Sequence, residues 1–390
     1  MTPSGTGGGG MAFGIELPAR ILFGRGEAAK APTLIAAWGA RGIVVHGASA
    51  ARAAPLVDGL CALGVEVLPW TTPKEPTLAM LEAALDAARP FRPDWVAAIG
   101  GGAAMDMGKA LAALIPQPTP PLPHLEGGAA PALPLGAPPL PFAAIPTTAG
   151  TGSEATRNAV IGLDSGGGRK VSLRDARMLA RLAIVDPALT DRCPRGVTLA
   201  SGLDAVTQLV EAFVSRRATP FTDALAREAI GPAMAALVRL MEEDDAAARD
   251  RLSWGSLCGG IALANAGLGA VHGLAGVIGG RTGAAHGAIC GALLGPVLAM
   301  NRRLAAGAAA GRLDEAMGRL APALGCAGPD VPAALAAWTR RTGLPGLAAQ
   351  GLDPADHAGV AEAGLGASSM KGNPVAVTAP DLVRAMAEAG

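Results

Sequence analysis

The first half of the chain alternates short apolar runs with segments of helical periodicity, and this pattern constrains the fold more than any other feature. Apolar runs of the kind that form strands occur at 20–24, 43–47, 65–68, 95–99, 142–145 and 182–185. Helical segments separate several of these runs, at 48–63, at 77–88 and from about Asp106 onward. Strands that alternate with helices predict a parallel sheet covered by helices on both faces.

The pattern changes near Pro194, where we predict a domain boundary. Beyond Thr198 the strand signals vanish, and Ala- and Leu-rich segments with helical periodicity continue to the end of the chain. A chain of 390 residues is long enough for two domains with separate cores. The sequence therefore predicts an α/β domain at 13–194, followed by an all-α domain at 195–390.

Two segments lie outside the predicted elements. Residues 1–12 open with a stretch rich in Gly, Ser and Thr, which predicts disorder. The segment 116–141 contains ten prolines, and it predicts an extended surface loop within the first domain.

Charge and cysteine content argue against several classes of protein. The 32 Lys and Arg side chains balance 32 Asp and Glu side chains without blocks of like charge, which argues against nucleic-acid or electrostatic membrane binding. The stretch Leu257–Gly280 has no charge, but Asn265, His272 and eight glycines interrupt it, so we predict a buried helix rather than a membrane span. The five cysteines lack CxxC spacing, as expected of reduced thiols in a cytoplasmic protein.

The triplet Gly100-Gly101-Gly102 lies between an apolar run and a predicted helix. Glycines let the backbone approach a phosphate closely, and the free N–H groups of a helix N-terminus attract its negative charge. Such ligands bind at the strand ends of parallel sheets. A tight turn would also use glycines, so the triplet alone leaves both interpretations open.

The segment Pro146–Glu154 reads PTTAGTGSE and comes directly after another apolar run. Its three threonines, one serine and two glycines offer hydroxyl groups and bare backbone to a polar ligand. A Ser/Thr-rich turn with a helix cap at Ser153 is the structural alternative.

Two of the five histidines, His272 and His286, lie in a glycine-rich apolar stretch. A buried imidazole needs a hydrogen-bond partner or a metal ion. Asp204 and Gln208 are four residues apart, so on a helix they share one face. One carboxylate, one amide and two imidazoles could close around a divalent ion. The alternative is a pair of core histidines satisfied by backbone groups.

Taken together, these motifs resemble those of the iron-containing (group III) alcohol dehydrogenase family. The segment Gly100–Lys109 is similar to the family's GGGSxxDxxK motif, and Pro146–Glu154 reproduces its PTTAGTGSE motif. Asp204 and Gln208 are similar to the Asp and His of its metal-site helix, and the two later histidines match in their spacing of fourteen residues. The resemblance extends from about residue 15 to residue 386.

The resemblance implies a dehydroquinate synthase-like architecture, with NAD(P) bound to the α/β domain and the active site in the cleft between the domains. It also implies hydride transfer between the nicotinamide and an alcohol or aldehyde, with Fe2+ or Zn2+ polarising the substrate oxygen. Because the family often forms dimers, a homodimer is expected.

The same resemblance implies roles for particular residues. The metal ligands would be Asp204, Gln208, His272 and His286, and the catalytic residues would be Asp204, His272, His286 and Lys170. The cofactor-binding residues would be Gly47, Ser49, Gly100, Gly101, Gly102, Asp106, Thr147, Thr148, Thr151, Ser153 and Lys170. Among these, the glycine triplet would hold the pyrophosphate, the threonines would line the adenine and ribose side, and Lys170 would reach the nicotinamide ribose.

The chain departs from the family at three positions. Gln208 stands where the family has a histidine ligand, and an amide oxygen is a harder and weaker ligand than imidazole. The ion would then be held by three protein ligands, bound weakly, or absent. Gly276 stands where many members carry a second histidine near the substrate. Gly47 stands where NAD-preferring members place an aspartate, so a 2′-phosphate is not repelled, and Ser49 and Arg52 are close enough in sequence to bind one. NAD and NADP both stay open.

The family also contains maleylacetate reductases, which reduce a carbon–carbon double bond and need not use a metal. Lys170–Arg174 resembles that subgroup's Lys-x-Ser-Leu-Arg, and Lys170 or Arg174 could pair with an acidic substrate. Metal-free reduction of an unsaturated or oxo acid is therefore the alternative function. A member that has lost catalysis and serves as a binding protein is a further hypothesis, which the intact motifs disfavour.

Overall fold

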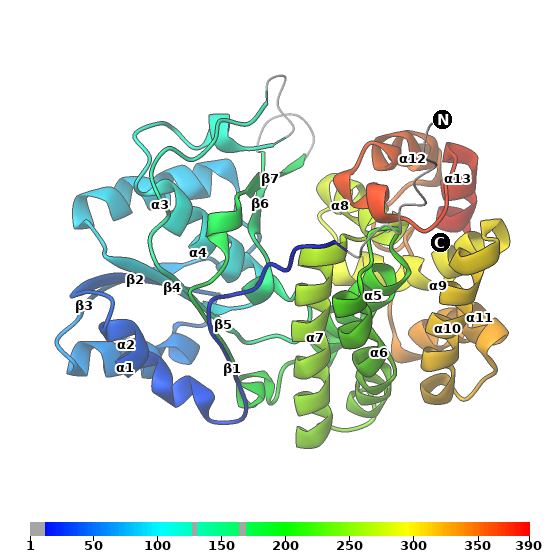
Figure 1. Cartoon of the computed structure of the whole chain (residues 1–390), viewed down its shortest axis with the longest axis horizontal. Coiled ribbons are helices and arrows are strands. Elements are labelled where there is room, and N and C mark those ends of the chain that lie inside the picture. The colour runs from blue at the N-terminus through cyan, green and yellow to red at the C-terminus, as the bar shows by residue number, and fades with distance from the viewer. Residues whose placement is uncertain (1–11, 127–130, 164–168) are drawn as a thin grey trace, which may run out of the picture.

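The chain forms two lobes that lie side by side (Figure 1). The computed structural model describes residues 12–126, 131–163 and 169–390. Within these ranges, all strands lie before Asp186 and the elements from Arg195 onward are helical. We call these parts the α/β lobe and the helical lobe. The segment 1–12 that was predicted to be disordered lies, except for Ala12, outside the described residues.

Six strands of the described α/β lobe form one parallel sheet, with the order β1-β8-β5-β4-β2-β3. In that order they are Ile21–Phe23 (β1), Leu182–Val185 (β8), Phe142–Pro146 (β5), Trp95–Gly100 (β4), Arg41–His46 (β2) and Glu66–Thr71 (β3). The accompanying helices are Ala31–Ala36 (α1), Ala50–Ala62 (α2), Leu78–Phe91 (α3) and Gly102–Leu114 (α4).

Helices cover both faces of this sheet because its central strands are apolar on both sides. Ile43 and Val45 of β2 belong to the core that includes α3 and α4. Val44, between them, belongs to the core that includes α1 and α2. Successive side chains of a strand point to opposite faces, so a continuous apolar run serves both cores. The predicted parallel sheet covered on both faces is confirmed.

Two local predictions were wrong. Helix α4 begins at Gly102 rather than near Asp106, so the last residue of the glycine triplet already belongs to the helix. The prediction also missed an antiparallel pair of strands, Asn158–Gly162 (β6) and Lys170–Arg174 (β7). Each of these strands buries only alternate residues, and such short two-sided patterns give a weaker signal than fully buried runs.

The proline-rich segment at 116–141 is a loop, as predicted, and its described part is held by one buried amide. Gln117 Oε1 accepts hydrogen bonds from the backbone of Gly136 and Ala137, at 3.0 Å each. Gln117 Nε2 donates to the carbonyls of Ala113 and Ala137. The loop therefore has a fixed base rather than being extended throughout, because a buried amide needs its hydrogen bonds satisfied.

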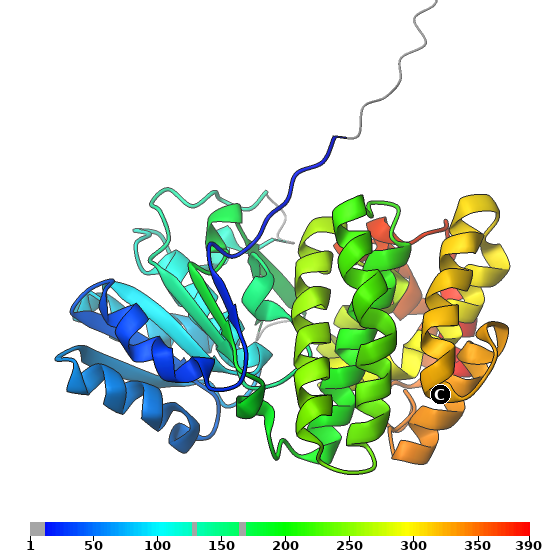
Figure 2. The same cartoon turned by 60° about the horizontal axis from the view of Figure 1, so that its bottom comes forward.

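The helical lobe is a bundle built around its first helix. The helices are Arg195–Val214 (α5), Pro220–Leu240 (α6), Ala246–Ala266 (α7), Ala270–Thr282 (α8), His286–Leu304 (α9), Gly307–Leu324 (α10), Val331–Thr342 (α11), His357–Leu365 (α12) and Ala379–Glu388 (α13). Figure 2 shows α5, α6 and α7, in green, packed next to one another beside the α/β lobe. By length and composition α5 could cross a membrane, as could the bent pairs α7–α8 and α10–α11, but 83% of the apolar window of α5 is buried inside the fold.

The uncharged stretch Leu257–Gly280 forms two helices rather than the single helix that we predicted. Helix α7 ends at Ala266, helix α8 begins at Ala270, and the two are bent by 100°. Gly267 makes the break with φ of +70°, a backbone conformation that glycine adopts without strain.

The lobes meet through close backbone contacts that glycines make possible. A Cβ atom on Gly260 of α7 would lie 2.3 Å from the carbonyl oxygen of Gly152, and one on Gly150 would lie 2.6 Å from Cβ of Ser201 on α5. The loop after β5 therefore rests directly on the backbones of α5 and α7. This contact places the PTTAGTGSE segment between the lobes.

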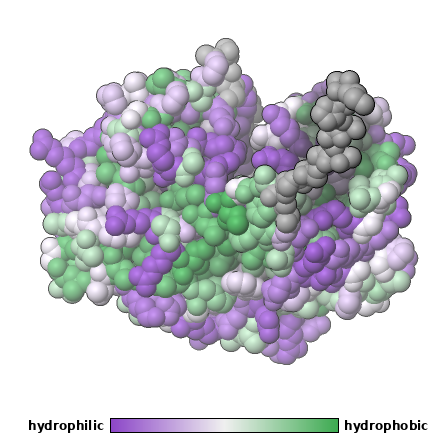
Figure 3. Space-filling view, in the orientation of Figure 1, coloured by the Kyte–Doolittle hydropathy of each residue, from purple (hydrophilic) through white to green (hydrophobic). Residues whose placement is uncertain are grey.

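An arm at residues 12–20 also joins the lobes. Asn265 of α7 accepts a hydrogen bond from the backbone N–H of Glu16 at 2.8 Å and donates to its carbonyl at 3.0 Å. Figure 3 shows hydrophobic residues gathered in the middle of the face in view, with hydrophilic residues around them. Phe13, Ile15 and Leu17 of this arm and Phe23 of β1 are exposed.

We predict that Gly260→Ala destabilises the protein by about 1–3 kcal/mol, because the added methyl group would collide with the Gly152 backbone, which cannot rotate away as a side chain can. Chemical denaturation monitored by circular dichroism measures the change. The matched control is Gly311→Ala in α10, which is exposed and has no atom within 4 Å of the new Cβ. That change should stabilise by up to about 1 kcal/mol, because alanine favours a helix. Equal effects of both substitutions would refute the proposed contact.

Candidate active site

Helix α5 carries a polar face that the surrounding apolar helices bury. Asp204, Gln208 and Glu211 lie at positions i, i+4 and i+7, which share one side of a helix. All three are less than 5% exposed. Buried carboxylates are costly unless they are paired, so the partners of this face come from neighbouring helices.

Helices α8 and α9 bring the partners to α5. His272 lies in the first turn of α8, and His286 is the first residue of α9. Gly283, with φ of +70°, ends α8. Gly287 lets α9 approach α5 closely, since a Cβ there would lie 2.2 Å from the Ala200 carbonyl oxygen. Cys290 follows His286 by one turn and therefore shares its face.

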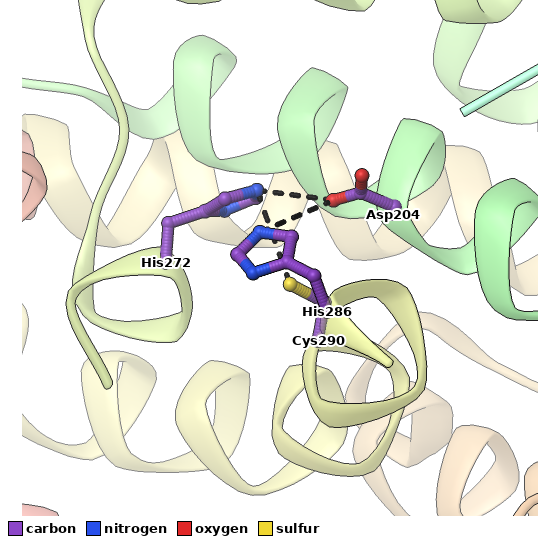
Figure 4. A group of neighbouring side chains, drawn as sticks. All are labelled: Asp204, His272, His286 and Cys290. Carbon is purple, nitrogen blue, oxygen red and sulfur yellow. Dashed lines mark hydrogen bonds and ion pairs between the residues drawn. The ribbon is translucent and has the colours of Figure 1, made fainter. Parts of the chain in front are cut away.

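These elements bring four potential metal ligands together, as Figure 4 shows. One ligand atom each of Asp204, His272, His286 and Cys290 lies within 4.8 Å of all the others. Asp204 Oδ1 lies 3.2 Å from His272 Nε2 and 3.9 Å from His286 Nε2. Cys290 Sγ lies 3.9 Å from His272 Nε2. The predicted convergence of Asp204, His272 and His286 is thus observed, with Cys290 added to it.

Glu211 fixes the orientation of His272. Its Oε2 lies 2.7 Å from His272 Nδ1, and its Oε1 accepts a hydrogen bond from the Val271 backbone at 2.7 Å. With Nδ1 engaged by this carboxylate, Nε2 faces Asp204. A carboxylate behind an imidazole is the usual outer partner of a metal-ligating histidine, because it sets the tautomer and raises ligand basicity.

The charges of the group support one another despite burial. Burial disfavours the Asp204 carboxylate, but the hydrogen bond from His272 and the charges of His286 and His272 outweigh it and lower the pKa of Asp204. Burial likewise disfavours a Cys290 thiolate, but the charges of His286 and His272 outweigh it and lower the pKa of this thiol. Asp, Cys and two His side chains, which bind metals as carboxylate, thiolate and neutral imidazole, are a donor set that fits a divalent transition metal.

Access to the group is from the side of His286. The His286 side chain is 33% exposed, whereas those of Asp204 and His272 are 3% and 6% exposed. A Cβ on Gly276, one turn after His272 on α8, would have no atom within 4 Å. Because Gly276 stands where many family members carry a histidine, the space next to His272 on α8 is open.

Gln208, predicted as a metal ligand, hydrogen-bonds to the α/β lobe through its side-chain amide. Its Nε2 donates a hydrogen bond to the Thr151 carbonyl at 3.1 Å. Its Oε1 is buried without a hydrogen-bond partner, and a Cβ on Gly259 would lie 3.2 Å from it. The structure thus gives Gln208 a contact between α5 and the loop after β5, and its role as a ligand stays a prediction.

The predicted cofactor residues gather at the carboxyl ends of β2, β4 and β5. A Cβ on Gly100 would lie 3.3 Å from the Gly47 nitrogen, which places the ends of β2 and β4 together. A Cβ on Gly101 would lie 3.4 Å from Thr148 Oγ1, and a Cβ on Gly102 would lie 2.9 Å from the Thr151 methyl group. The backbone of the triplet thus lies against the threonine loop, at the N-terminus of α4.

Four further cofactor predictions fall at the same edge. Thr147 is buried and its N–H donates to the Gly100 carbonyl, while Ser49 is exposed just before α2. Asp106 and Ser153 hydrogen-bond each other at 3.1 Å. Buried Lys109 Nζ donates to Ser153 Oγ at 2.7 Å. Asp106 and Ser153 therefore brace the loop against α4.

Lys170 reaches the border of the two lobes. Its Nζ pairs with Glu75, and a Cβ on Gly279 of α8 would lie 3.2 Å from that nitrogen. The structure thus brings Lys170 to the helix that carries His272. Arg174 pairs with Glu126 at 3.2 Å on the surface.

Sequence reasoning missed Glu211 and Cys290. Both had a usable signal, because Glu211 lies seven residues after Asp204 and Cys290 lies four after His286, spacings that share a helix face.

A nucleotide-binding type of sheet edge that faces a helical lobe with a group of metal donors is the arrangement expected of a metal-dependent oxidoreductase. The family described as iron-containing alcohol dehydrogenase matches residues 18–187, and its C-terminal part, described as Fe-containing alcohol dehydrogenase family, C-terminal, matches residues 198–390. The chain therefore belongs to the iron-containing alcohol dehydrogenase family.

Similar proteins carry related names. The probable alcohol dehydrogenase EutG of Salmonella typhimurium is 38% identical over 228 residues, covering 58% of this chain and 56% of that protein. The NAD-dependent methanol dehydrogenase of Bacillus methanolicus is 34% identical, covering 56% of each chain. The chain thus matches little more than half the length of these relatives. The structure of a 1,3-propanediol oxidoreductase superposes with a TM-score of 0.86 at 25% identity, covering 97% of this chain and 100% of that one.

Glu154, the last residue of the PTTAGTGSE segment, carries a buried carboxyl group. Burial raises its pKa to about 7, although a backbone hydrogen bond and the charge of Lys109 oppose the shift. The folded state therefore binds a proton that the unfolded state releases between about pH 4.5 and pH 7.

We predict that this proton makes folding stability fall as pH rises through that window. From about pH 5 to about pH 7 the group should cost the wild-type protein about 2 kcal/mol, and Glu154→Gln should remove that loss. Urea denaturation at both pH values measures it. Glu362→Gln, an exposed change in α12, is the control and should leave the pH dependence as in the wild type. Identical pH profiles for Glu154→Gln and wild type would contradict the shifted pKa.

Proposed function

We propose that the chain is an NAD(P)-dependent, metal-assisted oxidoreductase that transfers hydride between the nicotinamide and an alcohol or aldehyde. The observation that carries the proposal is the group of four ligand atoms within 4.8 Å on α5, α8 and α9. Membership of the iron-containing alcohol dehydrogenase family supports it. So do the names of relatives, which include alcohol, methanol and butanol dehydrogenases.

The α/β lobe would bind the nucleotide at the strand ends that carry the glycine triplet. Gly100 and Gly101 allow close approach of a pyrophosphate, and the N-terminus of α4 at Gly102 offers free N–H groups to its charge. Thr148 and Thr151 lie against this backbone and would offer hydroxyl groups to the ribose side. The nicotinamide would supply or accept the hydride, while the protein supplies orientation.

The helical lobe would hold the ion and the reacting oxygen. A divalent metal bound by Asp204, His272 and His286 would act as a Lewis acid towards the substrate oxygen. Glu211 keeps the His272 ring in place through its 2.7 Å contact with Nδ1. The open space at Gly276 and the exposed side of His286 leave room for a small substrate. We propose that this site faces the nucleotide across the contact between the lobes.

The alternative, an acid-reducing enzyme without a metal, gains no support from the two cations proposed for it. Lys170 pairs with Glu75 and Arg174 pairs with Glu126. An acidic substrate would have to displace a protein carboxylate from either cation. The alcohol or aldehyde assignment requires no such exchange.

We predict about one metal ion per chain in protein purified without chelator, and loss of that ion in His286→Ala, because the variant lacks one donor. Reduction of simple aldehydes should fall by more than about 100-fold, beyond the loss that removing an outer-shell partner causes. NADH and NADPH binding, followed by nucleotide fluorescence, should persist because those residues lie on the other lobe. Elemental mass spectrometry measures the ion.

The control for this experiment is His357→Gln, a histidine of α12 outside the group, which should keep both metal and activity. Full activity of His286→Ala would refute the metal role. Metal-free wild-type protein that reduces maleylacetate would instead establish the alternative function.

The coenzyme preference is proposed to depend on Gly47. This residue directly follows β2, lies beside Gly100, has no side chain, and is followed by exposed Ser49 and Arg52. Without a carboxylate at this strand end, nothing there repels a 2′-phosphate, and an arginine nearby could pair with one. We therefore propose that the site accepts NADP as well as NAD.

We predict that Gly47→Asp weakens NADPH binding by about tenfold more than NADH binding, because the new carboxylate repels the 2′-phosphate and accepts hydrogen bonds from the ribose hydroxyls of NADH. Titration calorimetry with both nucleotides measures the ratio. Arg52→Ala should weaken NADPH binding alone. Equal changes in NADH and NADPH affinity in both variants would show that the residues after β2 do not discriminate between the 2′-hydroxyl and the 2′-phosphate.

A further inference from the structure

Cys290 occupies a position that no other residue of the group duplicates. It lies one turn after His286 on α9, is completely buried, and forms no disulfide. Figure 4 shows its sulfur beside the His286 ring, with a dashed line that joins it to His272. A buried thiol with an ordinary packing role has no need of such polar neighbours.

The distances match those of a four-coordinate ion. With bonds of about 2.0–2.1 Å to nitrogen or oxygen and about 2.3 Å to sulfur, tetrahedral ligands stand about 3.3–3.6 Å apart. The corresponding separations here are 3.2 Å from Asp204 Oδ1 to His272 Nε2, 3.9 Å from Asp204 Oδ1 to His286 Nε2, and 3.9 Å from Cys290 Sγ to His272 Nε2. The other pairs of ligand atoms lie within 4.8 Å, so the four side chains would have to draw together to bind one ion.

Gln208, the other candidate for the fourth ligand, uses its amide nitrogen elsewhere. Its Nε2 donates to the Thr151 carbonyl, while its Oε1 is buried without a hydrogen-bond partner. An amide oxygen is also a weaker ligand than a thiolate for a borderline-soft ion.

We propose that Cys290 is the fourth protein ligand of the metal, as a thiolate, and that the site is therefore of the zinc type: one carboxylate, two imidazoles and one thiolate. This inference rests on the proposed function, since it concerns the ligands of the same ion. Thiolate and imidazole donors select zinc-like ions over Mg2+ or Mn2+. The exposed side of His286 is where a substrate oxygen would approach an ion held by these residues.

X-ray absorption of the zinc-loaded wild-type protein tests this without any mutation. We expect one sulfur scatterer beside the nitrogen and oxygen ligands. In the cobalt-substituted protein we expect a near-ultraviolet thiolate-to-metal charge-transfer band. Zinc bound with nitrogen and oxygen ligands only would overturn the assignment of Cys290 while leaving the proposed function intact. A wild-type protein that binds no metal would overturn both.

Variants extend the test. Cys290→Ser should abolish the cobalt band and weaken zinc binding by at least about tenfold, the smallest loss seen even for outer-shell partners, with NADH binding unchanged. The matched control is Cys258→Ser on α7, another fully buried thiol, whose pKa burial raises to about 12. That variant should keep the band and the affinity. A band that survives in Cys290→Ser would refute the proposal.

Discussion

The pairing of His272 with two carboxylates of α5 is the interaction on which the helical lobe depends. Asp204 and Glu211 are buried next to the large apolar core of this lobe, and charges in such a place are tolerated only with close partners. His272 meets both, with one ring nitrogen on each carboxylate. The first turn of α8 is thereby fixed against α5.

The same helix connects the metal group to the nucleotide edge. Gly102 at the start of α4 lies against the Thr151 side chain, and the Thr151 carbonyl accepts the hydrogen bond from Gln208. Gln208 is one turn from Asp204. Three contacts thus lead from the predicted pyrophosphate site to the predicted ion, and glycines at 150, 152 and 260 allow the loop to come this close.

Much of this arrangement could be predicted from sequence, for identifiable reasons. Buried parallel strands are continuous apolar runs, so the sheet and its coverage were readable, whereas β6 and β7 bury alternate residues only and β7 was noted only as a motif. His272 and His286 stood out because histidine is rare in apolar stretches. Glu211 and Cys290 did not stand out, because their shared-face spacing is common on helices and only tertiary packing decides which of these faces meet. The 100° bend after Ala266 had the same cause.

The proposed ligand set is consistent with how the site is built. Its donors come from three helices that converge on one point, so the fourth position can be filled from α9 when α5 does not supply it. Gln208 keeps the helix register and the buried volume and supplies the contact between lobes, while Cys290 approaches from the opposite helix with a softer donor. Donors from three helices that meet at one point fix where an ion would bind more strongly than they fix which residue supplies each ligand.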